Sequence, residues 1–344
     1  MPFNNSTSYI HYAEKAKNIS EFGFFFTSIF CAVLIYLTNF EVTRDFGSYK
    51  HLFLMFPVFG IIFATLEMIL YPNAFSHNSG YIFYSTSRPF QLSQNATSWL
   101  LVSYSGIYSS TISNLAVQFL YRYWAIFDEK KIWIFKGWRL LICMLYSILF
   151  GFQWGLGTYY FDQIDDYSKN YFELEMMQKF SADFSNISGL ILVAYDSNRS
   201  IRWRNVCCTI NMTFIMLFQY SIIMYCAIRM YFEMESKVQI LSPALRNLHR
   251  QFFKTLVLQV VTPTVTLFAP VTVLIYLPLF DLQLDLPFGI FLSTLSIFPG
   301  TDAIIVMYVV QDYRLAMKNM GQKFTGSIIT WANSPSATVV PVAN

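Results

Sequence analysis

Seven long segments of this sequence contain almost no charged side chains. A bilayer core about 30 Å thick is crossed by roughly 20 apolar residues in a helix. Inside such a core the backbone must satisfy its own hydrogen bonds, and these apolar segments lack the polar-apolar alternation of barrel strands. The sequence therefore predicts an all-α integral membrane protein, a seven-transmembrane helix bundle. The expected spans are residues 22–40, 52–71, 98–121, 140–161, 205–228, 255–280 and 286–310.

The connecting loops predict which side of the membrane each end occupies. With the N-terminus outside, 15 of the 23 Lys and Arg residues fall on the cytosolic side, as the positive-inside rule favours. Asn-x-Ser/Thr sequons mark exterior surfaces, and none falls in an expected cytosolic loop. The candidate glycosylation sites on the expected outer side are Asn4, Asn5, Asn18, Asn95, Asn186 and Asn198. We expect an extracellular tail at 1–21, a seven-helix domain at 22–310, and a cytosolic tail with a short amphipathic helix at 311–344.

Several function classes find no support in the residues. Only 12% of residues are charged, against about 25% in soluble domains, and no basic stripe points to nucleic acid. There is no HExxH, GxSxG or P-loop motif, so we do not expect an enzyme. The five cysteines form no CxxC pair or Cys/His cluster, so neither a metal site nor a cofactor is expected. None lies at the outer end of the third span, so packing rather than a disulfide must hold the loop at 162–204.

Blocks in four spans share one resemblance. The third span ends in Gln118–Tyr123 (QFLYRY), and Arg246–Gln259 (RNLHRQFFKTLVLQ) leads into the sixth, where Pro263 and Pro270 follow. The seventh contains Phe298–Asp302 (FPGTD) and then Gln311–Arg314 (QDYR), and the second has Glu67 before Tyr71–Pro72. Over residues 45–320 the chain resembles the nematode Str-type seven-transmembrane G-protein-coupled chemoreceptors. It departs where the family often has proline after the aspartate of the seventh helix, because this chain has Ala303.

The resemblance implies a chemosensory, olfactory type of receptor. Its partners would be a small external odorant or soluble cue, a heterotrimeric G protein and membrane lipid, in the plasma membrane of sensory neuron cilia. Two alternatives stay open: a seven-helix ion channel or transporter, and a protein that helps other receptors to traffic. The absence of an internal repeat disfavours the transporter. Both termini on one side of the membrane would contradict a receptor.

A group of residues near the inner ends of the helices is predicted to couple to the G protein or to switch. Arg122 stands where an arginine contacts the G protein in such receptors, although Tyr121 replaces the acidic neighbour common elsewhere. Asp302 is one of two acids inside the spans, where a charge costs on the order of 2.5–3.5 kcal/mol, and it should face the bundle. Prolines loosen helices six and seven. The full set is Arg122, Tyr121, Tyr123, Arg250, Lys254, Pro263, Pro299, Asp302 and Arg314.

A second group is predicted to line a ligand pocket between the outer halves of the helices. Tyr104, Tyr108 and Thr111 fall on one helix face. Glu67, the other acid inside a span, faces either this pocket or the lipid headgroups. Aromatic walls with a few hydroxyls favour a small neutral ligand. The pocket candidates are Glu67, Tyr104, Tyr108, Thr111, Asn211, Phe268, Thr272, Tyr276 and Ser293.

Overall fold

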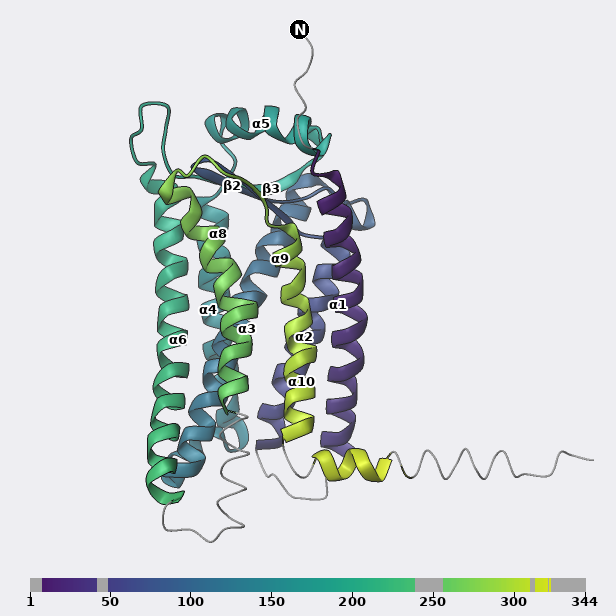
Figure 1. Ribbon diagram of the computed structural model, residues 1–344, viewed down its shortest axis with the longest axis vertical. Coiled ribbons are helices and arrows are strands. Elements are labelled where there is room, and N and C mark those ends of the chain that lie inside the picture. Colours follow the sequence, from purple (N-terminus) through teal and green to yellow (C-terminus); the bar gives the residue numbers. More distant parts are fainter. Residues whose placement is uncertain (1–7, 42–48, 239–255, 310–312, 321, 323–344) are drawn as a thin grey trace, which may run out of the picture.

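The protein is an upright bundle of long helices (Figure 1). A computed structural model describes residues 8–41, 49–238, 256–309, 313–320 and 322. The first five bundle helices are α1 (Ile10–Tyr36, continued by a π-helical turn at Leu37–Glu41), α2 (Tyr49–Leu70), α3 (Gln94–Phe127), α4 (Leu140–Phe161) and α6 (Trp203–Val238). The sixth bundle helix comprises residues 256–263, a π-helical segment (Thr264–Phe268) and α8 (Ala269–Phe280). The seventh comprises α9 (Gly289–Thr294), a 3-10 turn (Leu295–Ile297) and α10 (Phe298–Val309). The predicted seven-helix bundle is confirmed.

The outer faces of the bundle are suited to lipid. Five helices of the described part are long and apolar enough to cross a membrane: Ile10–Glu41, Gly137–Phe161, Trp203–Glu233, Leu256–Phe280 and Gly289–Val309. The second apolar helix, Leu54–Leu70, is slightly shorter. Large apolar side chains such as Phe22, Phe25 and Leu217 are more than half exposed. In water these faces would be unfavourable, because each Å² of exposed apolar surface costs about 25 cal/mol.

Helix α3 is the polar exception, and its position explains why. Nearly every residue from 106 to 119 is buried, including the polar side chains of Ser109, Ser113 and Asn114. The Ser113 hydroxyl donates to the carbonyl of Ser109 one turn earlier (2.9 Å), so this polarity does not interrupt the helix. Because α2, α4 and α6 surround α3, its hydroxyl groups face protein rather than lipid.

Helices α3 and α4 pack with their backbones almost in contact. A Cβ added to Gly106 would lie 2.8 Å from the carbonyl oxygen of Gly151, and one added to Gly151 would lie 2.0 Å from Ser110 Oγ. At Gly155, one turn further along α4, an added Cβ would meet its nearest atom at 3.3 Å. The Gly151 and Gly155 pair is thus a small-residue motif of the kind that allows helices to approach closely in membranes.

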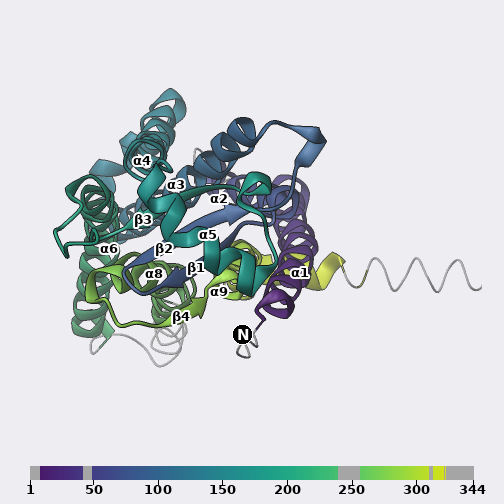
Figure 2. The ribbon, with the colours of Figure 1, turned by 90° about the horizontal axis from the view of Figure 1, so that it is seen from above.

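A four-stranded antiparallel sheet covers one end of the bundle, a feature that the sequence did not predict. The strands are β1 (Asn73–His77), β2 (Gly80–Ser85), β3 (Ser188–Val193) and β4 (Asp285–Pro287), and their order is β3-β2-β1-β4. A tight turn at Asn78, whose φ is 46°, joins β1 to β2. Helix α5 (Asp166–Phe180) lies across the outer side of the sheet (Figure 2).

Strands β2 and β3 are buried on both faces, so the residues in the middle of each strand are continuously apolar rather than alternating. Tyr81 and Phe83 of β2 face the bundle core together with Leu190 and Leu192 of β3. The alternate residues, among them Ile82 and Ile191, pack instead against Phe172 and Met176 of α5. The loop at 162–204 is therefore held by strand pairing and packing. All five cysteines lie in the described part and are free thiols, as expected for a loop without a disulfide.

A short helix at residues 313–320 crosses the other end of the bundle, below α10 (Figure 1). Tyr313 is fully buried and its hydroxyl lies 2.8 Å from Thr38 Oγ1 at the end of α1. Arg314, Leu315 and Lys318 are exposed. This helix has the one-sided burial expected of an amphipathic helix at a membrane surface.

Candidate functional site

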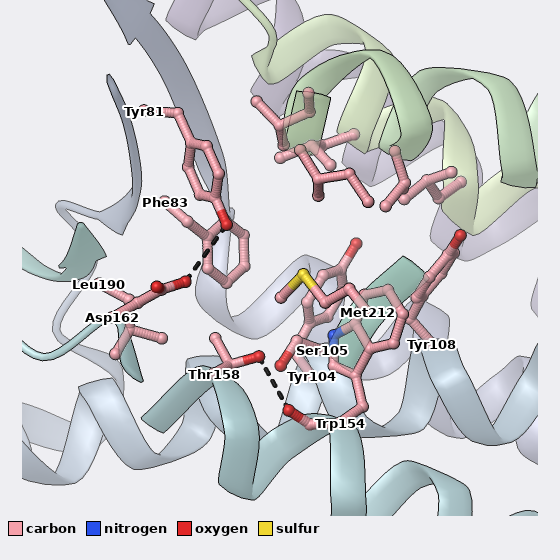
Figure 3. A pocket seen from close by; sticks show the side chains of 15 residues that line it. Tyr81, Phe83, Tyr104, Ser105, Tyr108, Trp154, Thr158, Asp162, Leu190 and Met212 are labelled. Atoms are coloured by element: carbon pink, nitrogen blue, oxygen red, sulfur yellow. Dashed lines mark hydrogen bonds between the residues drawn. The ribbon is translucent and has the colours of Figure 1, made fainter. Parts of the chain in front are cut away.

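A cavity of about 60 Å³ lies directly beneath the sheet (Figure 3). Tyr81, Phe83 and Leu190 of the sheet form its roof. Its walls are Tyr104, Ser105, Tyr108, Trp154, Thr158, Asp162, Met212, Val271, Leu274, Ile275, Leu292 and Leu295, from α3, α4, α6 and the last two bundle helices. Pockets for drug-sized ligands measure about 300–1,000 Å³. In this conformation the cavity accepts a molecule of a few heavy atoms, or expands as its walls move.

Two aromatic side chains of α3, Tyr108 and Tyr104, line the cavity and contact the elements around it. The Tyr108 ring meets the Trp154 ring edge-on, with 5.5 Å between centroids, and the Tyr108 hydroxyl donates to the Leu267 carbonyl (3.0 Å). Leu267 lies in the π-helical segment of the sixth helix, so this bond ties the cavity wall to an irregular turn. The Tyr104 ring stacks on Phe63 of α2 and on Phe83 of the roof, at 4.7 and 6.1 Å.

A carboxyl group, Asp162, lies at one side of this otherwise apolar space. It directly follows α4, outside the predicted spans, and it is completely buried. The Tyr81 hydroxyl donates to Asp162 Oδ2 at 3.3 Å, as the dashed line in Figure 3 shows. Burial raises the pKa of Asp162 to about 7, although Cys208, Asn205, Tyr81 and the charge of Arg204 act in the opposite direction.

Four of the pocket residues predicted from the sequence lie in or beside this cavity. Tyr104 and Tyr108 line it. Glu67 and Ser293 lie behind Tyr104 and are fully buried. Glu67 accepts a hydrogen bond from Ser20 of α1 (2.7 Å), and its carboxylate is close to Tyr104 and Ser293. Glu67 therefore faces the bundle interior rather than the headgroup region.

The other five predicted pocket residues lie elsewhere. Phe268, Thr272 and Tyr276 line a separate groove of about 440 Å³ between α6 and the sixth helix, where Tyr276 bonds Thr213 (2.9 Å). The Thr111 hydroxyl donates to the carbonyl of Ile107 within α3 (2.9 Å). Asn211 faces α4 and accepts a hydrogen bond from Gln153 (2.9 Å).

At the opposite end of α3, Arg122 connects to the sixth helix. Its guanidinium donates to Gln259 Oε1 and lies over the Phe119 ring, 5.6 Å from the centroid. Asp302 of α10 is buried and within electrostatic reach of Arg122. This arrangement joins three of the bundle helices through one cation.

The remaining predicted switch residues surround this contact or break the helices. Tyr121 packs edge-on against Phe135 (5.0 Å), and Tyr123 against Tyr225 of α6 (5.9 Å). Pro263 directly precedes the π-helical segment, and Pro299 opens α10 after the 3-10 turn, as expected where proline removes a backbone donor. Arg314 is exposed. Arg250 and Lys254 lie outside the described residues.

The four candidate glycosylation sites that the structure describes are exposed, and most lie toward the sheet end. Asn95 is in the first turn of α3, Asn186 and Asn198 are in the connection that carries α5 and β3, and Asn18 is on α1. Asn4 and Asn5 lie outside the described residues. The grouping agrees with the predicted outer side, which stays a prediction.

Sequence reasoning missed the roof residues Tyr81, Phe83 and Leu190, together with Asp162. A signal for the first two was present: Asn78-Ser79-Gly80 between two apolar runs is typical of a hairpin turn. Nothing in the sequence marked Asp162, because it is one of several acids in the loop at 162–204 and its burial depends on contacts from β2 and α6.

A lipid-facing seven-helix bundle with a capped cavity at one end and an arginine contact at the other defines a multi-pass membrane protein of the serpentine receptor class. The chain belongs to the Str family of that class, since the family described as "Serpentine type 7TM GPCR chemoreceptor Str" matches residues 16–318. It is 34% identical to the G-protein coupled receptor str-33 of Caenorhabditis elegans, over 92% of this chain and 93% of that one. It is 24% identical to the serpentine receptor class r-10 of the same organism, over 85% and 87%.

Proposed function

We propose that this protein is a chemosensory, olfactory receptor that binds a small external molecule beneath the sheet and activates a heterotrimeric G protein. The sheet end would face outside, in the plasma membrane of sensory neuron cilia, with glycans on the exposed sequons. Catalysis has no part in this function. The family relationship supports the receptor class, and the internal contacts support the mechanism.

The observation that carries the proposal is that α3 contacts the sixth helix at both ends. Near the cavity Tyr108 bonds the Leu267 carbonyl, and near the other end Arg122 bonds Gln259. Between them Pro263 and the π-helical segment weaken the regular hydrogen bonding of the sixth helix. A ligand that displaces Tyr108 would therefore favour a different position of this helix, and the Arg122–Gln259 contact would break. Allosteric coupling requires two sites that both influence one element with two positions. Here the two sites would be the cavity and the Arg122 contact, and the element would be the sixth helix.

Removing the cation tests this mechanism. In cells that express the receptor, Arg122→Ala is expected to lower ligand-evoked second-messenger output by about tenfold or more, within the 5–150-fold range of allosteric couplings. Screening volatile and soluble compounds against the wild type supplies the ligand. Arg139→Ala is the matched control, because among the described residues that guanidinium stacks on Trp133 (4.6 Å) and not on the sixth helix. Normal signalling by Arg122→Ala at wild-type surface levels would contradict the proposal, as would a ligand-gated current without G protein, which a channel would give.

Replacing Gln259, the hydrogen-bond partner of Arg122, should raise signalling instead of lowering it. Gln259 is buried, and a hydrogen bond to a charged group contributes about 1.5–3 kcal/mol. Gln259→Leu removes that bond from the resting arrangement, so signalling without ligand is expected to rise about tenfold or more, as a loss of about 1.5 kcal/mol or more implies. Gln153→Leu, on the exposed face of α4, serves as the control. Unchanged or lower basal output in Gln259→Leu would show that this contact does not hold the inactive state.

A further inference from the structure

The buried carboxyl group of Asp162 lines the cavity, and a neutral, apolar ligand would leave it without a binding partner. It is fully buried, and only Oδ2 is bonded, to Tyr81. Oδ1 forms no hydrogen bond of standard geometry with any residue that the structure describes. A buried carboxylate without a full set of partners is costly, so such a group calls for an explanation.

The neighbours of Asp162 do not supply a counter-charge. The Asn205 amide donates instead to the carbonyls of Phe161 and Ile191 (3.0 and 3.3 Å). The Cys208 thiol lies beside the carboxyl group, but a thiol is a weak donor.

The other polar side chains around Asp162 are also engaged elsewhere. The Thr158 hydroxyl donates to Trp154 O (2.9 Å). The cation nearest in sequence, Arg204, is exposed and donates to Tyr160 O (3.2 Å). Within the described part of the chain, Asp162 makes no salt bridge.

Aromatic rings surround the same space. Tyr81, Tyr108 and Trp154 line the cavity with Asp162 (Figure 3). The faces of such rings attract a cation, by about 0.5–2 kcal/mol each depending on desolvation. A carboxylate within a ring of aromatic side chains is therefore chemically complementary to an ammonium group. Met212, Val271 and Leu274 also line the cavity and provide an apolar surface for a short hydrocarbon chain.

We infer that the cavity binds a small aliphatic amine, whose ammonium group pairs with Asp162 beneath Tyr81 and whose hydrocarbon part packs against Met212, Val271 and Leu274. This inference rests on the proposed function only for the location of the ligand. It departs from the neutral ligand predicted from the sequence, because that prediction was made from aromatic and hydroxyl side chains without Asp162. The small volume favours amines of about three to six carbons.

The inference predicts a pH dependence for binding. Burial raises the pKa of Asp162 to about 7 in the empty cavity, whereas alkyl ammonium groups, like lysine, lose their proton only near pH 10. Lowering the pH below about 7 protonates the carboxyl group and removes the ion pair. Amine affinity should therefore fall by about tenfold per pH unit below 7 and change little between pH 7.5 and 8.5.

The test uses purified full-length receptor in nanodiscs and matched probes. Propylamine, isoamylamine and cyclohexylamine are each compared with the alcohol of the same skeleton, and binding is measured as the rise in Tm at pH 8. We expect the amines to bind at least about tenfold more tightly than the alcohols. Asp162→Asn should remove that difference while alcohol binding remains. Asp166→Asn, an exposed change of the same charge on α5, should behave as the wild type.

Each outcome decides the inference. Amines that bind no better than their alcohols to the wild type at pH 8 would overturn it, and so would an amine preference that survives Asp162→Asn or persists unchanged at pH 5.5. If Asp162→Asn does not fold, the wild-type pH titration decides alone. Because binding is measured without a G protein, the two proposals fail separately. Amine binding without signalling would contradict the receptor function, and Arg122-dependent signalling by neutral compounds alone would contradict the amine site.

Discussion

Gly151→Ala is expected to lower the amount of folded protein at the cell surface several-fold. The added methyl group would lie 2.0 Å from Ser110 Oγ and 2.6 Å from the carbonyl oxygen of Gly106. The serine side chain can rotate away, but the Gly106 carbonyl belongs to the backbone of α3, so the two helices must separate. Overpacking of this kind costs about 1–3 kcal/mol and sometimes more. Because folded proteins have only about 5–15 kcal/mol in reserve, we expect a large fall in surface expression and a lower Tm of purified protein.

Gly155→Ala is the matched control for this change. Its added Cβ would lie 3.3 Å from the nearest atom, Val102 O, and 3.4 Å from Val102 Cγ1, so a small adjustment accommodates it. The cost should stay below about 1 kcal/mol and is offset by the better helix propensity of alanine. Equal effects of the two substitutions would show that close α3–α4 packing is not what stabilises this end of the bundle.

Lys179→Met is expected to destabilise the cap, which consists of the four-stranded sheet and α5. Lys179 is almost buried at the end of α5, and its amine bonds Glu175 (2.6 Å) and Asp285 of β4. Asp285 also bonds His77 of β1 (2.5 Å). Methionine keeps the hydrocarbon packing but leaves two carboxylates close together without their cation. Losing one partner of a buried pair costs about 3–5 kcal/mol, and we expect about 2 kcal/mol here because Asp285 is 34% exposed.

Hydrogen exchange measures the loss of stability in the strands themselves. The amide protons of β1, β2 and β4 should exchange about 30-fold faster in Lys179→Met, as 2 kcal/mol implies, while those of α3 should not change. Lys169→Met, an exposed substitution on the same helix, is the control. Unchanged protection of the strands in Lys179→Met would contradict a role for this lysine in holding α5, β1 and β4 together.

The same cluster makes the cap sensitive to pH. Burial disfavours the ionised form of Asp285, but hydrogen bonds from Lys179 and His77 outweigh it, and the pKa of Asp285 lies below its ordinary value. Burial likewise opposes the charge of Lys179, but its two carboxylate partners raise its pKa. The contribution of the carboxylate is present above about pH 4 and is lost as the pH falls further, and that of the lysine is lost only above about pH 10. Protection of the strands should therefore fall as the pH is lowered through about 4 and as it is raised through about 10.

The helices could be predicted from sequence because lipid imposes a simple rule on length and charge. The cap could not, because β2 and β3 are short apolar runs that periodicity alone does not distinguish from helical segments. Their residues became strands through pairing across more than a hundred positions, such as Tyr81 with Leu192. No local pattern encodes a partner so distant.

Residues predicted to share a face lie together where the helix is regular. Tyr104 and Tyr108 are one turn apart on α3, and both line the same space. The sixth helix is different, because the π-helical segment at Thr264–Phe268 changes the residue spacing and rotates the faces that follow. Thr272 and Tyr276 therefore point into the groove beside α6 instead of the cavity. Asp162 illustrates a second limit, since a loop acid becomes a buried group only when other elements close over it.

The roof of the cavity also has a kinetic consequence. Strands β2 and β3 are buried throughout and lie beneath α5, so no molecule passes through the roof unless the cap opens. The rate of entry or exit by that route is limited by the frequency of the opening, and it falls as the cap becomes more stable.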